Sequence, residues 1–152
     1  MRLKVEFDVR DALPPKKDGA NSMWRKHGEF ERLLRLRAAA VQAFAGRPPL
    51  AHRIGLELSL YLPSNARAIG DLDNFITGVL DGLQAAAPQT PWQENPRWNR
   101  PEIDLYRPDR VVAIVDDCEV IEITARKILN GTADTWYSIV LEGNTTSDED
   151  PS

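Results

Sequence analysis

The sequence predicts an α+β fold, a two-layer sandwich in which helices pack on one face of a small mixed or antiparallel sheet. Two segments alternate strictly between apolar and polar residues, which indicates strands at 2–9 and 53–62. Each is followed by a segment with helical periodicity, at 22–45 and 73–86. After one long loop, the rest of the chain adds only strand-like segments. This order of elements is typical of the fold class.

In the first half of the chain, clear termination signals separate the elements. The first strand ends before Pro14 and Pro15, and a basic loop leads to a helix that starts near Ser22. The apolar stripe of that helix consists of Phe30, Leu33, Leu34, Val41 and Phe44. Gly46 and two prolines end it. The next helix takes Asp71 or Asp73 as its N-cap.

The segment 88–108 is a loop inserted in the domain, with five prolines, two tryptophans and no periodicity. Its aromatic residues either contact bases or a partner, or anchor the loop to its own domain. Short strands are then expected at 110–115, 119–128 and 135–141, with Asn130-Gly131 as a hairpin turn between the last two. We expect one domain, residues 1–142, and a disordered acidic tail, residues 143–152.

Composition restricts the location and the partners. No apolar run approaches the roughly 18 residues of a membrane span, and the first residues alternate like a strand and do not resemble a signal peptide. The single cysteine, Cys118, excludes an internal disulfide. The cytoplasm is therefore the expected compartment, without membrane association.

The charge distribution leaves nucleic-acid binding open. The net charge of −4 argues mildly against it. However, seven basic residues against three acidic ones lie between Lys16 and Arg37, and a local basic surface attracts phosphate whatever the total charge. The alternative interpretation of this segment is the solvated face of a helix.

Two pairs of aspartates are the main candidates for chemistry. Asp71 and Asp73 lie where a loop becomes a helix, and Asp116 and Asp117 follow an apolar run. Carboxylates on rigid element ends suit Mg²⁺, which activates water for phosphodiester cleavage. The simpler alternative is that one pair caps a helix and the other forms a turn. One cysteine and two histidines argue against a zinc site, and no phosphate-binding glycine motif indicates a nucleotide cofactor.

Three motifs together resemble the RusA family of Holliday-junction resolvases. They are Gly70-Asp71-Leu72-Asp73-Asn74-Phe75, Leu80-Asp81-Gly82-Leu83 and Val115-Asp116-Asp117-Cys118-Glu119-Val120. The resemblance covers roughly residues 67–128. It implies a homodimeric endodeoxyribonuclease that requires Mg²⁺, or Mn²⁺ in its place, and resolves four-way DNA junctions in recombination and repair.

The resemblance also implies roles for individual residues. Asp71, Asp73 and Asp117 match the catalytic, metal-binding carboxylates, and Asp116 is a further metal ligand beside them. Lys127 matches a catalytic lysine in the following strand. Basic residues are expected to contact the DNA backbone: Lys16, Lys17, Arg25, Lys26 and Arg67.

The chain departs from the family at two places. Thr77 stands where the family has a functional lysine, so that Arg67 or Lys127 would have to balance the transition-state charge. The family also lacks a segment like 88–108. Two alternatives follow: a junction- or nucleic-acid-binding protein with weakened or lost catalysis, and an interaction protein that binds no nucleic acid and uses the inserted loop.

Overall fold

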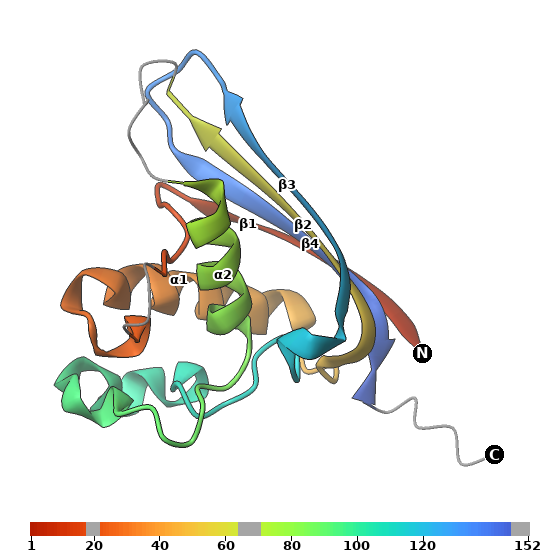
Figure 1. Ribbon diagram of the computed structural model, residues 1–152. Helices are drawn as coiled ribbons and strands as arrows, with labels where there is room; N and C mark the ends of the chain where they lie inside the picture. The colour runs from red at the N-terminus through yellow and green to blue at the C-terminus, as the bar shows by residue number, and fades with distance from the viewer. Residues whose placement is uncertain (18–21, 64–70, 147–152) are drawn as a thin grey trace.

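The computed structural model describes residues 1–17, 22–63 and 71–146, which form a sheet covered on one face by helices (Figure 1). The strands are β1 (Arg2–Arg10), β2 (Leu50–Leu62), β3 (Val120–Leu129) and β4 (Trp136–Thr145). The α-helices are α1 (His27–Phe44) and α2 (Leu72–Leu83). Five short 3₁₀ helices are η1 (Met23–Arg25), η2 (Trp92–Glu94), η3 (Pro96–Asn99), η4 (Pro101–Tyr106) and η5 (Asp117–Glu119). The predicted α+β sandwich is confirmed.

The four-stranded sheet is mixed, with the order β1-β4-β2-β3. β4 pairs antiparallel with both β1 and β2, whereas β3 pairs parallel with β2. In β2 the alternation seen in the sequence separates two environments. Leu56, Leu58 and Leu60 are buried under the helices, and Glu57 between them is exposed on the open face. The apolar pattern therefore determines which face of the sheet the helices cover.

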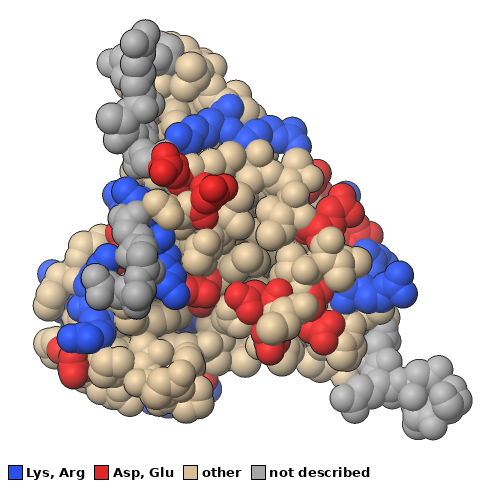
Figure 2. Space-filling model, in the orientation of Figure 1, with Lys and Arg blue, Asp and Glu red and all other residues tan. Residues whose placement is uncertain are grey.

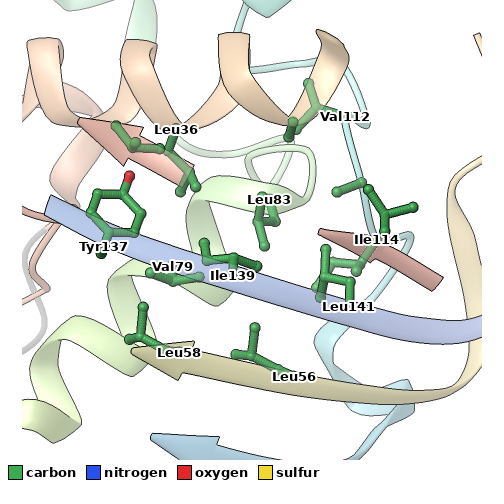
Figure 3. Packing of buried hydrophobic residues seen from close by; sticks show 14 of the residues in the cluster. Leu36, Leu56, Leu58, Val79, Leu83, Val112, Ile114, Tyr137, Ile139 and Leu141 are labelled. Atoms are coloured by element: carbon green, nitrogen blue, oxygen red, sulfur yellow. The ribbon is translucent and has the colours of Figure 1, made fainter. Parts of the chain in front are cut away.

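The main core lies between this face of the sheet and the two helices (Figure 3). Leu36 of α1 and Val79 and Leu83 of α2 pack onto Ile139 and Leu141 of β4. The α2 helix buries its apolar side and exposes the other, as its periodicity predicts. Among the described residues, no helix is long and apolar enough to cross a membrane.

A second cluster of buried residues anchors the inserted loop to its own domain. Trp98 is fully buried, donates its indole N–H to the carbonyl of Trp24 at 3.1 Å, and meets the Phe30 ring edge-on at 4.6 Å between centroids. Trp92 joins the same cluster. Of the two interpretations of these tryptophans, anchoring is therefore confirmed, and neither ring is available to stack on a base.

Arg37 connects the second cluster to the main core. Although the sequence places it in a basic segment, its side chain is fully buried. Its guanidinium donates five hydrogen bonds of 2.6–3.0 Å to backbone carbonyls, those of Gly82, Gln84, Tyr106, Arg107 and Arg110. Burial lowers the pKa of Arg37 to about 9, partly offset by Asp109, so that the side chain remains charged at neutral pH. Arg37 thus fixes the end of α2 against the inserted loop.

Several predicted boundaries were wrong. The segment from Ser22 starts as η1, which Ser22 caps through its hydroxyl, and the α-helix begins only at His27. The strand expected at 110–115 is only a single bridge between Ile114 and Leu50. The tail expected from Gly143 begins later, because β4 continues to the buried Thr145. Residues 147–152 of that tail lie outside the described residues.

The predicted hairpin at Asn130-Gly131 was also wrong. β3 and β4 flank β2 on opposite sides and do not pair with each other. The connection between them crosses the end of β2, where the amide of Asn130 donates to the carbonyl of Leu62 at 2.9 Å. This crossing leaves β3 at an edge of the sheet.

Candidate functional site

Asp71 and Asp73 lie at the first turn of α2, and their carboxylates are exposed. Asp71 is the N-cap residue by backbone geometry, but its side chain accepts no capping hydrogen bond. Within the described part of the chain, neither carboxylate has a hydrogen bond or an ion pair. The capping role therefore does not account for these side chains, and both are available to a ligand.

Thr77 and Asp81 continue the polar side of α2 beyond Asp73. Asp73, Thr77 and Asp81 are spaced four residues apart, which places them in a row along one face of α2. The hydroxyl of Thr77 donates to the carbonyl of Asp73 at 3.1 Å, within the helix itself. Thr77 therefore supplies no positive charge at the position where the resembled family has lysine.

The chain before α1 crosses α2 and places Lys17 at this face. A Cβ atom on Gly78 would overlap the backbone of Pro15, so that only glycine allows the close crossing. The amide of Lys17 donates to the carbonyl of Asn74 at 3.1 Å, and its ammonium pairs with Asp81 at 3.1 Å. This ion pair lies at the far end of the helix from Asp71.

Asp116 and Asp117 lie beside the end of α2. Asp116 directly precedes η5, and Asp117 is the first residue of η5. Asp116 is the N-cap of η5 and accepts a hydrogen bond from the amide of Cys118 at 2.9 Å. That bond lowers the pKa of Asp116. Asp117 has no part in this cap, and its amide donates to the side-chain carbonyl of Gln84 at 3.3 Å. Asp116 therefore has a structural role that Asp117 lacks.

A pocket of about 460 Å³ lies between the end of α2 and η5. Its polar lining includes Lys17, Asp81, Gln84, Asp116 and Asp117. The ligand atoms of Asp116, Asp117 and Cys118 lie within 4.8 Å of one another. Among the described residues, this is the one group of three such side chains close enough together to hold a metal ion. Asp81 lines this pocket although none of the roles expected from the sequence falls on it; its spacing from Asp73 indicates a shared helix face.

The two predicted pairs of carboxylates do not meet within one chain. They flank α2, which has 12 residues and at a rise of about 1.5 Å per residue is roughly 18 Å long. Figure 2 shows acidic side chains at both ends of α2 as separate groups, with an area free of charged side chains between them. Because Mg²⁺ binds its ligands at about 2.1 Å, one ion cannot contact both pairs in a single copy.

Lys127 lies nearer to Asp71 and Asp73 than its place in the sequence indicates. It pairs with Leu60 in the β2–β3 register, which puts it on the helix-covered face of the sheet. The end of β3 and the start of α2 lie at the same end of the sheet (Figure 1). The first carboxylate pair and the predicted catalytic lysine thus share one end of the molecule.

The predicted DNA-binding residues have differing surroundings. Lys17 and Arg25 form ion pairs with Asp81 and Glu94, both at 3.1 Å. Lys16 is half-buried, and its amide donates to Glu29 at 2.9 Å, while Lys26 precedes α1 as its N-cap residue. Arg67 lies outside the described residues. The basic segment is therefore a mixed surface around η1 more than an uninterrupted positive patch.

No family model matches the chain, and no curated protein matches it either. The resemblance to the RusA family therefore rests on the motifs themselves.

Proposed function

We propose that the protein is a divalent-cation-dependent endodeoxyribonuclease that acts on branched DNA, with four-way junctions as its substrates. One observation carries this proposal. Asp71, Asp73 and Asp117 occupy rigid element ends in the order of the resembled motifs, and none of them is used to cap its helix. Aspartate at a helix N-terminus is a preferred capping residue, so the absence of a capping hydrogen bond from Asp71 leaves another role open for its carboxylate.

The donor set fits Mg²⁺ or Mn²⁺, since all three proposed ligands are carboxylates, and two of them are exposed and have no partner among the described residues. In the homodimer that the resemblance implies, Asp71 and Asp73 of one copy and Asp117 of the other would hold the ion, which when bound supplies activation of water and neutralisation of phosphate charge. Lys127, at the same end as Asp71 and Asp73, supplies a second positive charge close to the phosphate. Asp116 supports this site by holding η5 in place.

The proposed substrate is symmetric, and a homodimer would match it. A four-way junction has near two-fold symmetry, so that two identical subunits present one site to each of two equivalent strands. Lys16, Lys17, Arg25 and Lys26 would contact phosphates and recognise shape more than sequence. The single cysteine is consistent with the cytoplasmic location that the sequence predicts.

The test is incubation of the purified protein with a labelled synthetic four-way junction and with a linear duplex of the same sequence. In Mg²⁺ we expect paired nicks in the junction, little cleavage of the duplex, and none of either in EDTA. The Asp73→Asn protein should bind the junction as well as the unaltered protein and nick it at least about 100-fold more slowly. Absence of nicking of any branched DNA in both Mg²⁺ and Mn²⁺ would refute the proposal.

A binding protein without catalysis is the second candidate, and Thr77 is the observation that favours it. The hydroxyl of Thr77 bonds to its own helix and leaves the first carboxylate pair without the cation of the resembled family. This candidate predicts salt-sensitive junction binding without nicking, and Thr77→Lys would then confer measurable nicking. The third candidate, a partner-binding role of 88–108, could not use the tryptophans of that segment, because they are buried.

A further inference from the structure

The backbone of Arg53 has a left-handed conformation in the interior of a strand. Among the described residues other than glycine, three have a positive φ: Asp11 at 55°, Ala45 at 51° and Arg53 at 53°. Asp11 directly follows β1, and Ala45 is the C-cap of α1, where this conformation is common. Arg53 lies within β2, so the end of an element does not explain its conformation.

The left-handed residue belongs to a β-bulge. The pairing of β2 with β4 shifts between His52 and Gly55. Arg53 and Ile54 therefore face a single residue of β4, which is Gly143. A bulge whose first residue is left-handed normally has glycine at that position, because any other side chain is strained there. Strain of this kind is concentrated at functional sites, where the surrounding structure maintains it.

The bulge lies across from η5, between two connections that join β2 to the chain before β3. At the first connection, the amide of Val115 donates to the carbonyl of Leu50 at 2.9 Å. At the second, Ile54 pairs with Val120. The bulge and η5 lie in the two segments between these connections, at the end of the sheet near the N-terminus (Figure 1). The irregular part of β2 is therefore next to the turn that has the second carboxylate pair.

A side-chain contact also joins the bulge to η5. Nδ1 of His52 lies 3.7 Å from Oε1 of Glu119. Neighbouring strands lie about 4.8 Å apart, so that Arg53, the next residue along, can reach a group bound at Asp117. Arg53 is exposed, and it forms no ion pair with Asp116, Asp117, Glu119 or any other described residue. Its guanidinium is therefore available to a ligand.

We propose that Arg53 binds a phosphate of the DNA beside Asp117 and supplies there the positive charge that Thr77 does not supply. The proposal rests on the proposed function, which makes branched DNA the ligand. A guanidinium donates two parallel N–H groups to a phosphate and stays charged at any pH of interest. The Arg53 side chain makes no hydrogen bond, ion pair or ring contact with the described fold, so the contact with phosphate is the gain that offsets the strain.

Binding of a four-way junction with non-hydrolysable linkages, measured in Mg²⁺ over a range of salt concentrations, tests the phosphate contact. We expect Arg53→Gln to raise the dissociation constant at least about fivefold at about 0.1 M salt. The slope of its logarithm against the logarithm of salt concentration should fall by about 1 per chain. Arg53→Lys should stay within about threefold of the unaltered protein, because it keeps the charge and loses only the paired donors.

Arg126→Gln is the matched control. It removes the same charge from another exposed arginine that has no ion pair among the described residues, on the open face of β3. The dissociation constant should change less than about twofold. A loss of affinity in Arg53→Gln that does not exceed the loss in Arg126→Gln would overturn the inference.

Melting curves separate this role from a structural one. Arg53→Gly should bind the junction as weakly as Arg53→Gln. It should nevertheless melt about 2 to 4 °C above the unaltered protein, because glycine adopts positive φ without strain. Arg53→Gln keeps the strain and should melt within about 1 °C of the unaltered protein. A midpoint for Arg53→Gly at or below that of the unaltered protein would also overturn the inference.

Failure of the proposed function gives a different result. An unaltered protein that binds the junction but nicks no branched DNA would refute the nuclease, and the salt dependence would still decide the role of Arg53. An unaltered protein that binds no junction even at low salt would overturn both.

Discussion

Replacing Asp117 by asparagine is expected to slow junction nicking at least about 100-fold, since loss of a group that merely supports a metal ligand already costs 10- to 100-fold. The backbone of η5 should not change, because Asp117 reaches the end of α2 through its amide and not through its carboxylate. The thermal midpoint should therefore stay within about 2 °C of the unaltered protein. Single-turnover nicking rates and a melting curve together provide the measurement.

Asp116→Asn is the matched control for Asp117→Asn. It removes the same charge from the neighbouring residue, but asparagine caps a helix about as well as aspartate, so the bond to the amide of Cys118 is preserved. We expect a loss of nicking below about tenfold. Equal losses in the two variants would contradict the assignment of Asp116 to structure and Asp117 to the metal.

Replacing Arg37 by methionine is expected to destabilise the fold by at least about 3 kcal/mol, because a buried acceptor left without its donor costs about 1 to 3 kcal/mol. Methionine fills much of the same volume, so the main loss is electrostatic. Five backbone carbonyls, on the end of α2 and on the inserted loop, lose their donor in a buried environment. Chemical denaturation should show this change as a lower midpoint.

Arg35→Met is the control for this change, because it makes the same substitution two residues earlier in α1. Arg35 is exposed and donates one hydrogen bond, to the carbonyl of Asp11 at 3.0 Å. Its replacement should cost at most about 1 kcal/mol. A similar cost in both variants would show that the buried hydrogen bonds of Arg37 contribute no more than a surface bond does.

Local periodicity was sufficient to predict most of the fold. The alternation in β2 and the helical spacing in α2 directly specify which side chains are buried, and the structure agrees with both. The pairing of strands depends on contacts between distant segments, which periodicity does not encode. The turn signal at Asn130-Gly131 therefore suggested a hairpin, although the chain crosses the end of β2 at that point.

The candidate site was predictable in part for the same reason. Asp71 and Asp73 are two residues apart in sequence, and their position at the start of a helix follows from local signals. Their separation from Asp117 depends on where η5 packs in the fold. It lies beside the end of α2, where the amide of Asp117 donates to Gln84, and the motifs alone do not reveal this position. Arg37 shows a related limit. Its charge predicts exposure, whereas the carbonyls that surround it come from segments some 45 to 73 positions away.

Mn²⁺ binding, followed by electron paramagnetic resonance, tests most directly whether carboxylates from both ends of α2 hold one ion. The measurement compares the unaltered protein with Asp73→Asn and Asp117→Asn, with and without a four-way junction that has non-hydrolysable linkages. Our account predicts one Mn²⁺ per chain, lost to a similar extent in both variants. A Mn²⁺ site that persists with unchanged affinity in either variant would contradict it.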